Sequence, residues 1–168
     1  MNAEELRNIQ APIKDKYKET PAAAMITLSA SGELGEGISC KVATGKAVIE
    51  AGLHPATGGN GMLACSGDLL LEALVACAGV TLTAVATAIG VVIKGGTVKA
   101  AGDLDFRGTL GVSKEAPVGF AAIRLQFILD TDAGGEELAS LAKLTERYCV
   151  VYQTLAKGVP VEASFAKQ

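Results

Sequence analysis

The chain has 168 residues and a net charge of −3, and 49% of its residues are hydrophobic although only 4% are aromatic. This length fits one domain with a core built mainly from Ala, Val, Leu and Ile. Acidic and basic residues are interspersed, which argues against the basic face that nucleic-acid binding requires.

The N-terminal segment is polar. Residues 1–20 contain no apolar h-region, so we expect no secretory signal and a cytoplasmic protein. In a reducing compartment, the four cysteines are expected to be buried, catalytic or metal-binding rather than joined as structural disulfides. Residues 3–18 predict a helix interrupted near Pro12. We take residues 1–22 as a helical extension and residues 23–168 as the main domain.

The next segments alternate between strand and turn patterns. Residues 22–30 predict a strand, residues 31–37 a turn, and residues 38–51 an alternating segment that a break near Thr44 and Gly45 can divide into two paired strands. Residues 54–61 (HPATGGNG) form a loop rich in Pro and Gly. This loop leads into the most apolar part of the chain.

A long apolar helix is predicted after this loop, capped by Ser66 or Asp68 and ended by Gly95-Gly96. Residues 73–93 contain no charge over 21 residues, which is long enough for a membrane span. The run is rich in Ala, Thr and Gly and lacks Trp and Tyr anchors, so we expect no membrane association. A helix that is apolar on all sides is also typical of a globular core, and its small residues favour close packing with another helix.

The rest of the chain predicts strands at 97–109 and 119–131, a helix at 135–156 and a closing strand at 159–166. This order predicts an α+β fold in which helices stack on antiparallel sheet.

The cysteines raise a pairing question. If residues 65–77 lie on one helix, Cys65 and Cys77 are about 18 Å apart, whereas a disulfide needs Cα atoms within about 7 Å. Cys77 therefore has a partner elsewhere or none. Cys40 alternates with Ile38 and Val42 on an apolar strand face and is expected to be a buried hydrophobic residue. Cys149 follows Arg147, and a nearby Arg can stabilise a thiolate.

Two segments, DLLLEALVACAGVTL and ERYCVVYQTLAKGVPVEASF, resemble the OsmC/Ohr family of osmotically inducible and organic-hydroperoxide-resistance proteins. The shared features are a cysteine in a long apolar helix, a second cysteine in a later helix, and Gly-Val-x-Val before a closing strand. The order of elements matches that fold from about residue 23 to 166.

The resemblance implies antiparallel sheets around the long central helix in an intertwined homodimer. It also implies a thiol peroxidase that reduces organic hydroperoxides in oxidative stress defence. Cys77 would form a sulfenic acid and Cys149 would resolve it as a disulfide, which a dithiol such as a lipoyl group reduces. No metal, flavin or haem is implied. The alternative is an OsmC-like protein that binds a small ligand or senses redox state without turnover.

The chain departs from the hydroperoxide-resistance branch at the groups that support the thiolate. That branch has an Arg in an early loop and a Glu ten positions before the helix cysteine. Here the arginines are only at 7, 107, 124 and 147, and Gly67 stands at the Glu position. By residue type, Asp68 is the candidate for the acid, and Lys41 or Arg147 for the cation.

Other sites remain open. His54, the only histidine, could pair with a nucleophilic cysteine or join Cys65, Cys77 and Cys149 at a zinc site. No metal-ligand spacing supports the zinc site. GGNG precedes a helix but lacks a P-loop pattern, so a turn or lid over the cysteine pocket is expected. Asp103 and Asp105 are expected to lie on a solvated strand face.

Overall fold

The computed structural model describes residues 3–34, 40–42 and 51–167. Its sheet has four strands, β1 (Met25–Leu34), β2 (Cys40–Val42), β3 (Gly95–Asp105) and β4 (Phe120–Asp130), in the order β2-β1-β3-β4. All neighbouring strands are antiparallel. The α+β class with antiparallel sheet is thereby confirmed. The predicted strand at 119–131 matches β4 to within one residue at each end.

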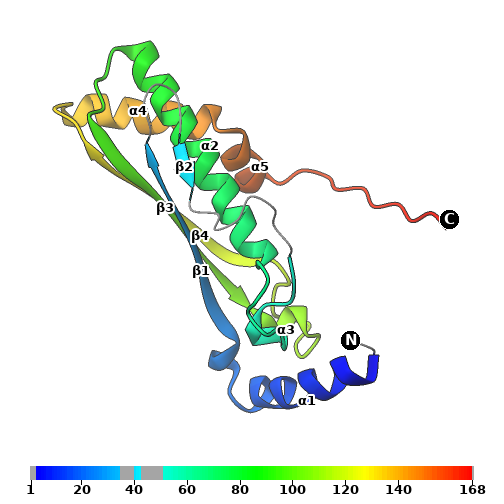
Figure 1. The fold of residues 1–168 in the computed structure, drawn as a ribbon. Helices are drawn as coiled ribbons and strands as arrows, with labels where there is room; N and C mark the ends of the chain where they lie inside the picture. Colours follow the sequence, from blue (N-terminus) through cyan, green and yellow to red (C-terminus); the bar gives the residue numbers. More distant parts are fainter. Residues whose placement is uncertain (1–2, 35–39, 43–50, 168) are drawn as a thin grey trace.

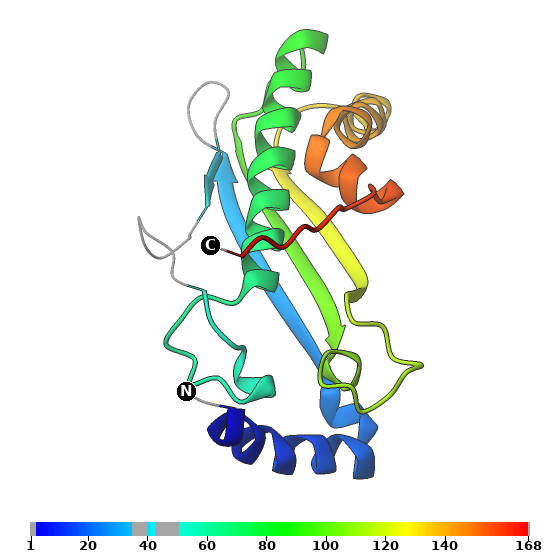
Figure 2. The same ribbon diagram turned by 90° about the vertical axis from the view of Figure 1, so that its right-hand side faces the viewer.

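The long helix α2 (Ser66–Ile89), α4 (Gly135–Tyr148) and α5 (Val150–Lys157) cover one face of the sheet (Figures 1 and 2). Leu71, Leu74, Val75 and Ala78 of α2 are buried in a cluster that also contains residues of β3. A second cluster joins the C-terminal half of α2 to Leu141 of α4. The expected long apolar helix of the core is therefore present.

By length and composition alone, α2 could also cross a membrane. Its buried residues recur at helical spacing and pack against the sheet, so burial in a folded core accounts for the apolar character of that face of the helix.

The ends of α2 differ from the prediction. Cys65 is the N-cap and makes no side-chain capping bond, so neither Ser66 nor Asp68 caps the helix. The helix ends at Gly90 rather than at Gly95-Gly96. Gly90 has φ +78°, a left-handed conformation that glycine adopts without steric cost, and its N–H bonds to the carbonyls of Ala86 and Thr87. Gly95 and Gly96 instead begin β3.

The strand predicted at 97–109 ends earlier, at Asp105. The Asp105 carboxylate accepts a hydrogen bond from the Arg107 N–H at 3.0 Å and so caps the short helix α3 (Phe106–Thr109). A capping carboxylate satisfies an N–H group that the helix itself leaves unpaired, which favours the helical turn over more strand.

The N-terminal helix α1 (Ala3–Glu19) runs through Pro12, so the predicted interruption is wrong. Hydrogen bonds on both sides of the proline attach α1 to the turn η2 (Pro55–Thr57): Gln10 donates to the Thr57 carbonyl at 3.4 Å and Tyr17 donates to the Ala56 carbonyl at 2.7 Å. These contacts hold both halves of α1 against the same neighbour.

The early strands are shifted from the prediction. A short turn, η1 (Pro21–Ala24), precedes β1, and β1 continues to Leu34 through part of the predicted turn at 31–37. The predicted strand segment at 38–51 contains β2. Its break at Thr44 and Gly45 lies outside the described residues.

The closing strand predicted at 159–166 is wrong for the isolated chain. This segment contains no helix or strand, and it extends away from the sheet (Figure 1). Its alternating apolar side chains Val159, Val161 and Phe165 are exposed, and Phe165 is 98% exposed. A strand needs a neighbouring backbone for its hydrogen bonds, and the tail lies beside no strand among the described residues.

Candidate active site

Two cysteines far apart in the sequence meet between α2 and the start of α5. Cys77 is half-buried in the middle of α2, and Cys149 is fully buried between α4 and α5. Their side chains hydrogen-bond to each other, and both are free thiols. The structure thus brings together the two cysteines that the resemblance to the OsmC/Ohr family singled out.

The helix predicted at 135–156 is broken at Cys149, which adopts an extended conformation with ψ 109°. Its N–H still bonds to the Thr145 carbonyl at 2.9 Å, and the Gln153 amide caps the Glu146 carbonyl at 2.7 Å. Val150 and Val151, which follow the break, are the first two residues of the next helix. The chain then starts a new helix, α5.

The new helix start supplies donors to sulfur. The Tyr152 N–H donates to the Cys149 sulfur at 3.4 Å. Burial acts to raise the pKa of Cys77, but four hydrogen bonds outweigh this effect, so the pKa is lowered. The donors are the Val151 N–H, the Cys149 thiol, the Thr81 hydroxyl and the Val150 N–H. N–H groups of a first helical turn have no partner within the helix and carry partial positive charge, so they stabilise a thiolate.

Cys149 has the opposite character. Burial, its hydrogen bond to Cys77 and the charge of the Cys77 thiolate raise the pKa of Cys149 to about 11, although the Tyr152 and Val151 N–H groups act against them. Cys149 therefore keeps its proton at neutral pH and donates it to the Cys77 sulfur. The pair consists of one ionisable nucleophile and one protonated thiol.

The candidate cations are not among the groups that lower the pKa of Cys77. Arg147 is exposed, and its guanidinium lies over the Tyr148 ring at 5.3 Å from the centroid. The side chain of Lys41 lies outside the described residues. Within the described part of the chain, hydrogen-bond donors stabilise the Cys77 thiolate, a role for which the family resemblance had suggested a cation.

Asp68 and His54 lie near the start of α2 rather than beside the cysteines. Asp68 precedes Cys77 by nine residues, about 13 Å along the helix. Burial raises the pKa of Asp68 and the nearby His54 acts against that rise. Burial and the charge of Asp68 raise the pKa of Glu72. His54 accepts a hydrogen bond at Nδ1 from the Ala56 N–H at 3.0 Å, and its ring stacks on Phe106.

No group of three or more His, Cys, Asp or Glu side chains suited to a metal ion occurs in the described residues. Cys65 is partly buried at the N-cap of α2, and the side chain of Cys40 lies outside the described residues. The GGNG loop forms a turn, with Gly58 at φ +95°, but none of its residues lines the cavity between β4 and the helices α2, α4 and α5, so the predicted position over a cysteine pocket is wrong. A Cβ on Gly58 would lie 2.3 Å from Ile9, so this loop packs on α1.

Asp103 and Asp105 are each paired with an arginine. Arg124 donates to Asp103 at 2.9 Å, and Arg107 Nε donates to both carboxylate oxygens of Asp105 at 3.0 Å. Asp105 is only 4% exposed, so the expected solvated strand face is wrong for this residue. Its role is to cap α3 and hold Arg107.

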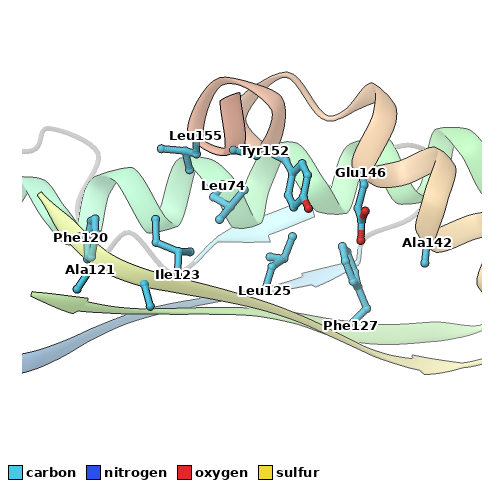
Figure 3. A pocket seen from close by; sticks show the side chains of 12 residues that line it. Leu74, Phe120, Ala121, Ile123, Leu125, Phe127, Ala142, Glu146, Tyr152 and Leu155 are labelled. Carbon is cyan, nitrogen blue, oxygen red and sulfur yellow. The ribbon is translucent and has the colours of Figure 1, made fainter. Parts of the chain in front are cut away.

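A cavity of about 540 Å³ lies between β4 and the helices α2, α4 and α5 (Figure 3), and its lining comes close to both cysteines in the sequence without including either. Its wall includes Leu74, one turn before Cys77, and Tyr152, whose N–H contacts the Cys149 sulfur. Ile123, Leu125 and Phe127 point into it from β4. This volume and apolar lining are typical of small-molecule sites.

The sequence could have indicated only part of this site. Thr81 follows Cys77 by four residues and therefore shares its helix face, which the helical period reveals. The donors Val150 and Val151 act through backbone groups that become available only because the helix breaks. The walls of the cavity come from separate segments, so no local pattern marks them.

Comparison with known proteins is consistent with this architecture. Residues 59–164 match the family model described as OsmC-like protein. The fold is similar to the crystal structure of an OsmC-like hydroperoxide resistance protein from Jannaschia sp. CCS1, with a TM-score of 0.61 and 16% sequence identity. The similarity covers 86% of this chain and 95% of that one. No curated protein matches the sequence.

Proposed function

Because the chain belongs to the OsmC-like protein family, we propose that it is a thiol peroxidase that reduces organic hydroperoxides in oxidative stress defence. The contact between Cys77 and Cys149, with the pKa of Cys77 lowered and that of Cys149 raised, carries this proposal. A peroxidase of this kind needs one thiolate for attack and a second thiol within reach to prevent over-oxidation.

In the first step, the Cys77 thiolate attacks the terminal oxygen of the hydroperoxide. The O–O bond breaks, a Cys77–OH sulfenic acid forms, and the other oxygen leaves as an alkoxide. The Cys149 thiol supplies the proton that converts this alkoxide into an alcohol. Cys77 is thereby oxidised by two electrons and the hydroperoxide is reduced by two.

In the second step, the Cys149 thiolate attacks the Cys77 sulfur. An S–S bond forms, and hydroxide leaves and takes up a proton as water. Burial makes Cys149 a poor nucleophile before the first step because it holds the thiol in its neutral form. Loss of its proton to the alkoxide would activate Cys149 only after Cys77 has been oxidised.

A dithiol, of lipoyl or another type, would return the disulfide to two thiols by thiol–disulfide exchange. No metal or other cofactor takes part in these steps. A reducing cytoplasm is the compartment that we propose, because it maintains such dithiols.

We also propose that the protein acts as an intertwined homodimer. On α2, Leu70, Ala73, Cys77 and Val80 recur at helical spacing, and Leu70 and Val80 are 38% and 39% exposed. A second α2 packed on this apolar face would cover it and exclude water from the sulfur. The exposed alternating segment at 159–166 has the pattern of a strand that pairs with a second copy.

The direct test treats reduced protein with one equivalent of cumene hydroperoxide and maps disulfides by mass spectrometry. A fast, stoichiometric Cys77–Cys149 bond is expected. A Cys65→Ser variant is the matched control and should form this bond at the wild-type rate, since Cys65 lies a long way along α2 from Cys77.

Slow oxidation spread over all four cysteines would contradict the peroxidase and favour ligand binding or redox sensing. Analytical ultracentrifugation tests the dimer. A Val80→Glu variant should sediment as a monomer, and a wild-type monomer at micromolar concentration would refute the dimer.

A further inference from the structure

The cavity between β4 and the helices α2, α4 and α5 contains an unexpected charge. Most of its lining side chains are apolar, and the exceptions are Glu146 and Tyr152. Figure 3 shows the Glu146 carboxylate and the Tyr152 hydroxyl pointing into the cavity, toward Phe127 and Leu125 of β4. Glu146 precedes Cys149 by three residues, although Cys149 itself is not among the residues that line the cavity.

The cavity continues along β4. A second hollow of about 320 Å³ under α4 shares Phe127 and Ala142 with the first, and it is lined by Leu82, Leu129 and Leu141. Together, the two hollows form an apolar path along β4, from Phe120 to Leu129. An elongated apolar substituent fits such a path better than a compact polar one.

Glu146 has no salt bridge to a cation in the described residues. Its carboxylate points into the apolar space (Figure 3), and its backbone carbonyl accepts a hydrogen bond from the Gln153 amide at 2.7 Å. Glu146 is solvent-exposed, so its carboxylate belongs to the accessible part of the cavity wall, where a second negative charge would be repelled. An uncharged chain would meet no such repulsion.

Building on the proposed peroxidase function, we propose that Glu146 makes the site select uncharged, elongated hydroperoxides over anionic ones. Hydroperoxides of esterified lipid chains belong to the favoured class and those of free fatty acids to the disfavoured class. At separations of several ångströms and an effective dielectric constant of about 20, the repulsion corresponds to a preference on the order of tenfold.

The test compares two substrates that differ only in charge: the hydroperoxide of linoleic acid and that of its methyl ester, in the same non-ionic detergent. We expect wild-type kcat/KM to be on the order of tenfold higher for the ester. Glu146→Gln should bring the ester-to-acid ratio of kcat/KM close to one, mainly by raising kcat/KM for the hydroperoxide of linoleic acid. Glu136→Gln, an exposed site in the first turn of α4 with the same charge change, should keep the wild-type ratio.

The inference is overturned if the ester-to-acid ratio of kcat/KM is the same in wild type and in Glu146→Gln. It is also overturned if Glu136→Gln changes this ratio as much as Glu146→Gln does. Titration calorimetry of Cys77→Ser with the unreactive hydroxy acid and hydroxy ester separates this inference from the proposed function. In one outcome, neither hydroperoxide is reduced while Glu146→Gln still removes the preference for binding the hydroxy ester over the hydroxy acid. That outcome would contradict the peroxidase function and support the charge selection. If both are reduced without a preference, the peroxidase stands and the charge selection fails.

Discussion

The backbone N–H of Tyr152 donates a 3.4 Å hydrogen bond to the sulfur of Cys149. This bond forms because Cys149 is the N-cap of α5, so its sulfur occupies the place of a capping oxygen. The two preceding N–H groups, from Val150 and Val151, hydrogen-bond to Cys77. The first turn of α5 therefore supplies hydrogen-bond donors to the sulfurs of both Cys77 and Cys149.

Val150→Pro removes one of these donors with little damage to the helix. Proline is tolerated at the first position of a helix, and the extended conformation of Cys149 suits a residue before proline. The pKa of Cys77 should rise, which leaves less thiolate at neutral pH. We expect the rate of reaction with hydroperoxide at pH 7 to fall by about three- to tenfold.

The measurement is a stopped-flow pH profile of Cys77 oxidation. In the wild type, the inflection should lie below the ordinary thiol pKa of 9.0, because the pKa of Cys77 is lowered. In Val150→Pro it should move to higher pH. Val150→Ala, which keeps the N–H group, should match the wild type, and a similar shift in both variants would contradict the donor role.

Cys149→Ser separates attack from resolution. The variant should consume one equivalent of hydroperoxide and then stop, because the Cys77 sulfenic acid has no thiol to capture it. Dimedone labelling followed by mass spectrometry should find the adduct at Cys77. Continued turnover with a dithiol reductant would show that Cys149 is not required for resolution.

Asp105→Asn tests the buried carboxylate at the end of β3. Hydrogen bonds from the Arg107 side chain lower the pKa of Asp105 below its ordinary value of 3.8, so ionised Asp105 stabilises the fold. This contribution is complete above the unfolded-state pKa and is lost as pH falls through the lower folded-state pKa. At pH 7 the variant should lose about 1–3 kcal/mol of unfolding free energy.

Urea denaturation at several pH values checks this expectation. The gap between wild type and Asp105→Asn should be constant from pH 7 to about 5 and narrow below the ordinary carboxyl pKa. Asp132→Asn is the control, because Asp132 forms an exposed salt bridge with Lys94 and should change stability little. A gap that persists unchanged in acid would mean that the charge of Asp105 does not contribute.

Tyr17→Phe tests how firmly α1 is attached to the rest of the fold. Tyr17 is 3% exposed, and its hydroxyl donates to the Ala56 carbonyl at 2.7 Å. Loss of this buried bond should cost about 0.5–1.5 kcal/mol of unfolding free energy. Tyr148→Phe, at a side chain that is 57% exposed, should have little effect in the same thermal or urea denaturation.

Sequence patterns anticipated the elements whose causes are local. The alternation in Phe120–Asp130 and the uncharged apolar run around Cys77 both appear in the structure as predicted. Period and composition are properties of neighbouring residues, so they can be read without knowledge of the fold. The resemblance also singled out Cys77 and Cys149 through their surrounding motifs.

The predictions failed where a distant contact decides the outcome. Pro12 lies inside a continuous helix because Gln10 and Tyr17 hold α1 against η2. The tail at 159–166 has a strand pattern, but a strand also needs a backbone partner, and the described residues of this chain provide none.

The sequence by itself determined the class of fold and the apolar central helix, and its motifs singled out the two cysteines that lie in contact. Only the tertiary structure decided what stabilises the Cys77 thiolate and which charge faces the cavity. Residue types suggested Lys41 or Arg147, whereas the donors found are backbone N–H groups and neighbouring side chains. Every residue except proline carries a backbone N–H, so the availability of that donor depends on where a helix begins and on which segment packs against it.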